Sequence, residues 1–216
     1  MSSLIFYTDE TQALIATDTL ATYPDGRPFL FTTKAFIVPH LRVIIAGTGA
    51  GGFLGRWFVR INDRMLLRGI EHLNHHTPAI LPTMWAELQK EFSFKDVSTT
   101  VYHFGFSEAT GQMRSYAYRS TNGFRSEDIA YGLGRKPECA VRDNYELPGD
   151  IKEMMDDQRS IQASQPKEER LYIGGEIVVH YLSNDGFKTY TLHRFDDYLA
   201  DEVAMYKNFG GSLSTG

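Results

Sequence analysis

Four short apolar runs crowd the first 46 residues, and this feature constrains the fold of the chain more than any other. The runs 4–7 and 13–16 flank a polar loop, and the runs 34–38 and 41–46 flank Pro39-His40. Each run has the length and composition of a β-strand. Parallel pairing needs a crossover of about a dozen residues or more, so strands this close in the sequence pair antiparallel.

The apolar spacing then changes from that of strands to that of helices. Apolar residues recur at helical spacing over 53–73, which predicts an amphipathic helix. A second helix is predicted over 77–91, with its main body after Leu81, because Pro82 is incompatible with a helix interior. The remaining predicted elements are strands over 97–106, 113–118 and 128–132, a helix over 150–164, a hairpin of 176–182 and 187–192, and a helix over 195–206.

The order of these strands and helices favours an α+β fold. No repeat or linker divides the 216 residues, so we expect one domain over 1–216. The stretch 210–216 is rich in Gly, Ser and Thr, and we expect it to fray.

The charge balance and the single cysteine exclude several classes of protein. Acidic residues outnumber basic ones, 27 to 22, which argues against a nucleic-acid partner bound by a basic surface. No apolar run approaches the ~18 residues of a membrane span. Cys139 is the one cysteine and the first residues lack signal-peptide features, so we expect a cytoplasmic protein without disulfides.

Two motifs favour chemistry that their context argues against. The stretch 47–52 has the G-x-G-x-x-G pattern of dinucleotide-binding turns, but a second helix follows instead of a parallel strand. A tight strand-to-helix turn is the alternative. His72, His75 and His76 could share a helix face as metal ligands, but histidine is also favoured at a helix end by the dipole. We expect no metal and no cofactor.

Asp18 and Lys34 each adjoin an apolar strand, Asp18 at its end and Lys34 at its start. A buried charge needs a partner, and these two residues can pair with each other. A plain salt bridge between neighbouring strands is the alternative. Ser2 adds a third group, because removal of Met1 leaves a free α-amine with a pKa of about 7.7–8.0, suited to a base.

Together these residues resemble the proteasome-type branch of the N-terminal nucleophile (Ntn) hydrolases, and in particular proteasome beta-subunits. The resemblance covers about the whole chain. It rests on short segments in matching order, namely 16–22, 32–37, 44–47, 125–134 and 174–179. By this resemblance the fold is a four-layer αββα sandwich of two antiparallel sheets flanked by helices.

The resemblance also implies an activity and roles for site residues. Ser2 would be the nucleophile and its α-amine the base, Lys34 and Asp18 would supply charge, and the Gly47 N–H would bind the oxyanion. The substrate, a peptide or another amide, would lie against Thr22 and Gly49, with Ile45 facing the first specificity pocket. Such subunits imply a homo-oligomer, expected to be ring-like; the sequence identifies no ATPase partner.

Several positions depart from the family pattern. The nucleophile is Ser rather than Thr, and Leu133, Arg170 and Ile173 stand where the family has polar groups that hold the terminal amine. These departures leave an alternative open, a catalytically inactive structural or assembly subunit of the same fold. A nucleotide-binding protein built on 47–52 is a third reading.

Overall fold

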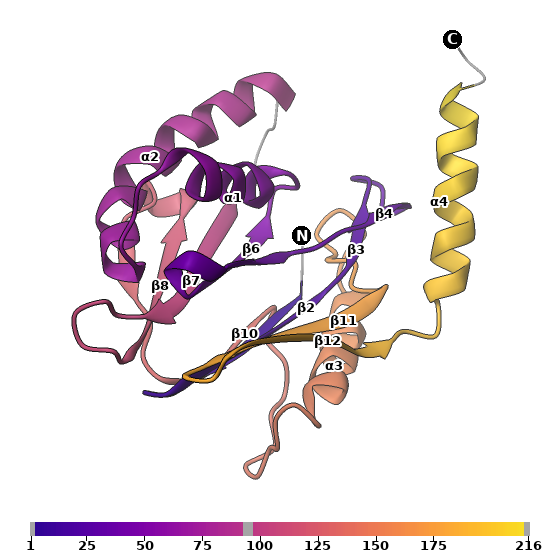
Figure 1. Ribbon diagram of the computed structural model, residues 1–216. Helices are drawn as coiled ribbons and strands as arrows, with labels where there is room; N and C mark the ends of the chain where they lie inside the picture. Colours follow the sequence, from indigo (N-terminus) through magenta and orange to yellow (C-terminus); the bar gives the residue numbers. More distant parts are fainter. Residues whose placement is uncertain (1–2, 93–96, 214–216) are drawn as a thin grey trace.

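The computed structural model describes residues 3–92 and 97–213. Within them, twelve strands form three antiparallel sheets, accompanied by four α-helices (Figure 1). Short 3-10 helices at Pro39–Leu41 and Ser120–Asn122 join neighbouring strands.

The first five-stranded sheet combines strands from the beginning of the chain with strands from its last third. Its order is β10-β1-β2-β11-β12, and every pair is antiparallel. Its strands are β1 (Leu4–Thr8), β2 (Gln12–Asp18), β10 (Gly132–Lys136), β11 (Glu176–Ser183) and β12 (Gly186–Arg194). Helix α3 (Ile151–Ala163) packs on one face of this sheet through Ile151, Met154 and Met155.

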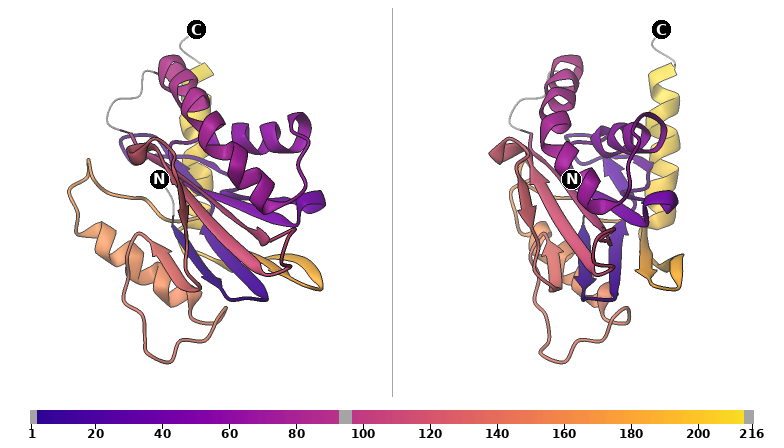
Figure 2. Two further views of the ribbon diagram at one scale, coloured as in Figure 1. Left: turned by 90° about the vertical axis from the view of Figure 1, so that its left-hand side faces the viewer. Right: turned by 60° about the vertical axis from the view of Figure 1, so that its left-hand side comes forward.

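The second five-stranded sheet has the order β5-β6-β7-β8-β9. Its strands are β5 (Ala35–Val38), β6 (Val43–Gly49), β7 (Thr99–Phe106), β8 (Met113–Arg119) and β9 (Ser126–Asp128). Helices α1 (Phe53–Arg64) and α2 (Ile70–Phe92) cover one face of it, on the side of the molecule away from α3 (Figure 2). Successive strand residues point to opposite faces, so Ile45 packs under these helices while Ile44 faces the other sheet.

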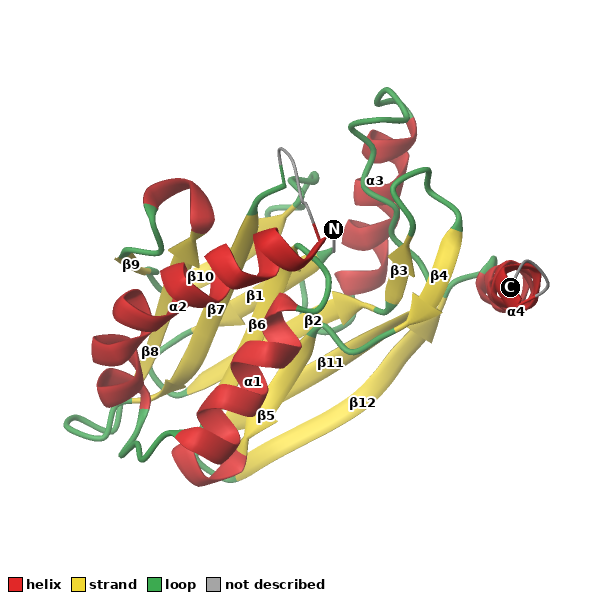
Figure 3. Ribbon diagram, turned by 90° about the horizontal axis from the view of Figure 1, so that it is seen from above, coloured by secondary structure: helices red, strands yellow, loops and turns green. Residues whose placement is uncertain are grey.

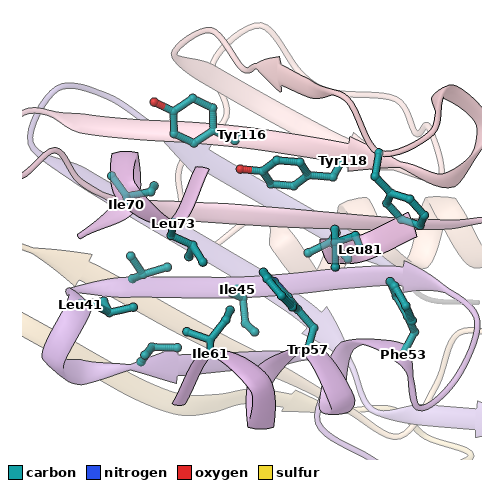
Figure 4. Packing of buried hydrophobic residues seen from close by; sticks show 14 of the residues in the cluster. Leu41, Ile45, Phe53, Trp57, Ile61, Ile70, Leu73, Leu81, Tyr116 and Tyr118 are labelled. Carbon is teal, nitrogen blue, oxygen red and sulfur yellow. The ribbon is translucent and has the colours of Figure 1, made fainter. Parts of the chain in front are cut away.

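The cluster beneath α1 and α2 contains the largest aromatic side chains of the core (Figure 4). Trp57 and Phe53 are fully buried there, and Trp85 joins them from α2. The Trp57 Nε1–H donates to His103 Nε2 at 2.9 Å, which ties α1 to β7. Burial without a charged partner lowers the pKa of His103 to about 3, so the imidazole stays neutral in the core.

The expected four-layer sandwich of two sheets is wrong, because a third sheet and α4 stand outside such layers. The third sheet pairs β3 (Leu20–Thr22) with β4 (Pro28–Phe31), and it carries α4 (Tyr198–Leu213) at the edge of the molecule (Figure 3). The backbone N–H groups of Thr19 and Leu20 both donate to the Gly174 carbonyl, and this contact turns the chain out of the first sheet after β2.

The helix predictions need two corrections. The predicted helix over 53–73 ends at Arg64, and α2 then runs from Ile70 to Phe92 with Pro78 and Pro82 inside it. Each proline removes one helical N–H, yet α2 buries a full face. The buried residues of α2 are Ile70, Leu73, Thr77, Leu81, Trp85 and Leu88. Tertiary packing therefore outweighs the local cost of the prolines.

The strand predictions are confirmed for β1, β2, β5 to β8, β11 and β12, within a few residues at their ends. The sequence reading missed β3 and β4, and the piece over 128–132 lies between β9 and β10, which belong to different sheets. Helix α4 overlaps the stretch from residue 210 that was expected to fray. In the ranges 3–92 and 97–213, no helix is long and apolar enough to cross a membrane.

Candidate active site

Asp18 and Lys34 form a buried ion pair where β2 ends and β5 begins. The Lys34 Nζ donates to Asp18 Oδ1 at 2.8 Å and to the Leu20 carbonyl at 2.6 Å. The Asp18 side chain is 0% exposed and the Lys34 side chain 7%. Burial lowers the pKa of Lys34, and the neighbouring Asp18 carboxylate opposes that shift.

Asp18 also binds two backbone N–H groups. Ser3 donates to Oδ1 at 2.9 Å, and Gly174 donates to Oδ2 at 3.2 Å. These donors and Lys34 satisfy a carboxylate that would be costly to bury alone. They also join the beginning of β1 to the ion pair, since Ser3 directly precedes that strand.

Ser2, the expected nucleophile, lies outside the described residues. Its neighbour Ser3 is fully buried, and the Ser3 hydroxyl donates to Gln158 Oε1 on α3. Gln158 in turn donates to the Pro137 carbonyl. A chain of polar contacts therefore fixes the start of β1 between the ion pair and α3.

A cleft of about 190 Å³ opens beside Lys34. Polar side chains and backbone make up much of its wall. The cleft is lined by Leu20, Ala21, Thr22, Thr32, Thr33, Lys34, Phe36, Leu54, Gly55 and Thr99, and by the stretch 47–52. Three of the residues expected to meet substrate, Thr22, Gly47 and Gly49, thus share one cleft with Lys34.

Ile45 and Gly47 lie in surroundings that differ from those of the other expected site residues. Ile45 is fully buried beneath α1 and does not line the cleft (Figure 4). The Gly47 N–H donates to the Lys34 carbonyl at 3.2 Å, so it continues the pairing of β5 with β6 rather than pointing freely into the cleft.

Two residues of the site, Gln158 and Gly174, were not predicted from the sequence. Gln158 is a polar residue at helical spacing with Ile151 and Met155 on the buried face of α3, and that position was a usable signal. Gly174 contributes a backbone N–H, which every residue type except proline also has, so no sequence signal marks this position.

Three positions depart from the family pattern. Leu133 and Ile173 pack with the cluster beneath α3, and Arg170 donates to the carbonyls of Ala163 and Gln165.

The glycine-rich stretch forms the turn from β6 into α1. Gly49 and Gly52 have φ values of +105° and +81°, which L side chains rarely adopt. After the two helices, β7 pairs antiparallel with β6, so these elements do not form the parallel β-α-β unit of a dinucleotide-binding fold. This antiparallel topology argues against the hypothesis of a dinucleotide-binding protein built on 47–52.

We expect Gly49→Ala to destabilise the fold. Left-handed backbone alone costs an L residue about 1–2 kcal/mol, and a Cβ on Gly49 would lie 2.1 Å from the Ser98 carbonyl oxygen. Denaturant unfolding measures the loss. Gly51→Ala is the control, because a Cβ there meets nothing within 4 Å; equal losses in the two variants would contradict the prediction.

The histidine cluster lies in the first two turns of α2, at the N-terminal end of the helix, where the dipole does not favour a protonated histidine. His72 Nδ1 accepts the Arg68 N–H at 3.3 Å, so a neutral His72 carries its proton on Nε2, facing His76 Nε2 at 3.0 Å. Across the described parts of the chain, no three or more His, Cys, Asp or Glu side chains gather as a metal site.

Asp201 on α4 lies close to Gly174. A Cβ added to Gly174 would be 3.4 Å from Asp201 Oδ2. Burial and the nearby Asp197 raise the pKa of Asp201 from 3.8 to about 6, against the effect of Arg159. The folded protein therefore binds this proton more tightly than the unfolded chain. The resulting stability is full below about pH 4 and is lost as the pH rises through about 6.

The wild type loses stability as Asp201 ionises, and we expect Asp201→Asn to abolish this pH dependence. The variant should therefore gain stability relative to the wild type as the pH rises from 4 to 7. The melting temperatures of the two proteins across this range measure the difference. Asp196→Asn, at an exposed position two residues before α4, is the control. A constant difference between Asp201→Asn and the wild type would rule the effect out.

Comparison with known proteins relates the fold to solved structures. No protein-family model and no curated protein matches the chain. The chain is similar to Anbu (ancestral beta-subunit) from Yersinia bercovieri, with a TM-score of 0.61 and 13% sequence identity over 99% of this chain and 95% of that one. It is also similar to an Anbu (Gly-1) mutant from Hyphomicrobium sp. strain MC1, with a TM-score of 0.60 and 12% identity over 99% and 98% of the two chains.

The fold is similar to that of Anbu proteins. These neighbours are proteasome-like but belong to a different family, so the prediction of a proteasome beta-subunit-like Ntn hydrolase is wrong at the level of the family. The segments behind that prediction are short, and at identities of 12–13% the likeness to the solved structures concerns the fold alone.

Proposed function

We propose that the chain hydrolyses amide or peptide bonds with Ser2 as an N-terminal nucleophile, exposed by removal of Met1. The observation that supports this most is the buried Asp18–Lys34 pair, which binds the Ser3 N–H and borders a cleft. The Ser3 nitrogen that donates to Asp18 at 2.9 Å is the atom to which residue 2 is bonded, and we therefore propose that the Ser2 hydroxyl lies beside Lys34.

In this proposal Ser2 supplies both the nucleophile and the base. The hydroxyl oxygen attacks the substrate carbonyl carbon while its proton passes to the α-amine. The amine then gives this proton to the leaving nitrogen, the C–N bond breaks, and an acyl-enzyme remains on Ser2. Water, deprotonated by the same amine, hydrolyses the ester and restores the serine.

Lys34 and the cleft wall stabilise the charge that develops. The Lys34 ammonium faces the attacking oxygen, and Asp18 keeps that ammonium charged and oriented. The Gly47 N–H exchanges its 3.2 Å contact with the Lys34 carbonyl for the oxyanion. Thr22 and Gly49 line the path of an extended peptide and offer backbone groups for pairing.

The alternative function is that of a catalytically inactive structural or assembly subunit. The observation that favours it is the Gly47 N–H, which already has a partner in the Lys34 carbonyl. In either case we propose a homo-oligomer, because one of the similar solved structures is an ancestral beta-subunit by name. The single buried Cys139 supports a cytoplasmic setting.

Covalent labelling tests the hydrolase proposal. Intact mass first shows whether the native protein has lost Met1. A peptide carrying an electrophilic group should then label Ser2, with a rate that rises near the pKa of a free α-amine, about 7.7–8.0. Ser2→Ala should abolish labelling, whereas Ser164→Ala, at an exposed serine that follows α3, should leave it unchanged.

The outcomes separate the two functions. Labelling that survives in the Ser2→Ala variant contradicts a nucleophilic Ser2. A trimmed terminus that never reacts, or a retained Met1, supports the inactive subunit instead.

A further inference from the structure

Helix α4 lies at the edge of the molecule, with the rest of the described chain to one side of it (Figure 3). Two contacts fix that inner side against β4. The Tyr198 ring stacks on Phe31 with centroids 4.4 Å apart, and Asn208 Nδ2 donates to the Pro28 carbonyl at 2.9 Å. The opposite side of the helix faces outward.

The outward side carries an apolar stripe. Leu199, Val203 and Tyr206 are 66%, 53% and 74% exposed. Their spacing of four and then three residues places them in one row, as at positions d, a and d of a coiled-coil heptad. Single exposed apolar residues are ordinary, but a continuous row on one helix indicates a surface that another helix covers.

The charges beside the stripe identify what covers it. Glu202 and Lys207 lie on opposite flanks of the row, five residues apart, at positions g and e of the same heptad pattern. Among the described residues neither belongs to an ion pair, although Glu202 is near enough to Arg194 to affect its pKa. Both side chains are therefore available to a partner.

These two charges also define the orientation of the partner helix. In a parallel pair of identical helices, a residue at g faces the residue five positions later on the other helix, so Glu202 faces Lys207 in both directions. In an antiparallel pair the same flanks meet, and each charge faces its own copy. Like charges repel, so the sequence of α4 suits a parallel pair and disfavours an antiparallel one.

We propose that α4 packs in parallel against α4 of a second copy of this chain, around a two-fold axis that runs along the helices. The inner side of α4 is covered by β4, and the outward stripe meets the partner's stripe. This inference gives a surface and an orientation to the proposed oligomer. It does not depend on the hydrolase activity.

Charge exchange tests the pairing by self-association. Sedimentation or light scattering should show the wild type associating, and Glu202→Lys and Lys207→Glu should each weaken the association roughly tenfold, because two attractive pairs become repulsive. The double variant should restore it. An equimolar mixture of the two single variants should also associate, since each lysine then faces a glutamate. Val203→Asp should abolish pairing.

The matched controls are Glu168→Lys and Lys167→Glu, which change the same charges in the exposed loop after α3. Circular dichroism confirms that each variant is folded, and labelling of Ser2 is recorded separately so that loss of activity and loss of pairing are distinguished. A monomeric wild type, unchanged association in the single variants, or a double variant that stays weak would each overturn the proposal.

Discussion

Asp18→Ala should lower the free energy of unfolding by about 3–5 kcal/mol, because it leaves the Lys34 ammonium buried without a counter-charge. The same change removes the acceptor of the Ser3 and Gly174 N–H groups, both of which are held inside the fold. Equilibrium denaturation in urea measures the loss, with the slope of the transition checking that the unfolding stays two-state.

Two controls distinguish a stranded charge from a general loss of contacts. Asp128→Ala removes an exposed partner of Arg114, and such surface pairs contribute about 0–1 kcal/mol. The double variant Asp18→Leu with Lys34→Met removes both charges at once. It should be more stable than Asp18→Ala, since apolar replacement of a whole buried pair is often neutral. A double variant less stable than the single one would contradict the argument.

Lys34→Met should slow the labelling of Ser2 by about 10²–10³-fold in protein that remains folded, the usual effect of losing one preorganised electrostatic group. The expected loss lies in the maximal labelling rate rather than in probe affinity, because the ammonium acts on the charge that develops during attack. Rates measured over a range of probe concentrations separate the two quantities.

Lys152→Met provides the comparison, because this lysine lies on the exposed side of α3 in an ion pair with Asp156. It should leave the rate unchanged. If Lys34→Met affects only probe affinity, Lys34 binds substrate without stabilising the reaction, and the proposed mechanism loses its electrostatic component.

The sequence predicted the ion pair because its two residues stand at the ends of apolar strands, where a charge must find a partner. It predicted the β11–β12 hairpin because Asn184, Asp185 and Gly186 form a strong turn signal between alternating residues. Both inferences rest on local chemistry that the residue types carry.

Other features depend on contacts that residue types do not carry. The third sheet was missed because Pro28 begins β4 and the strand is half-exposed, so its apolar residues do not alternate clearly. The placement of Ile45 followed a family pattern, whereas alternation along β6 directs Ile45 toward α1 and the core. Helix α2 continues through two prolines because of packing that becomes visible in the folded chain.

The two tryptophans of the sequence, Trp57 and Trp85, lie in the same cluster beneath α1 and α2, while the one thiol, Cys139, is buried in the cluster under α3. The protein therefore carries an intrinsic fluorophore on one side and a reactive group on the other. Emission during unfolding follows the loss of packing around α1 and α2. The rate at which a disulfide reagent reaches Cys139 follows the opening around α3, so the two signals together report when each side loosens, without any engineered tryptophan or cysteine.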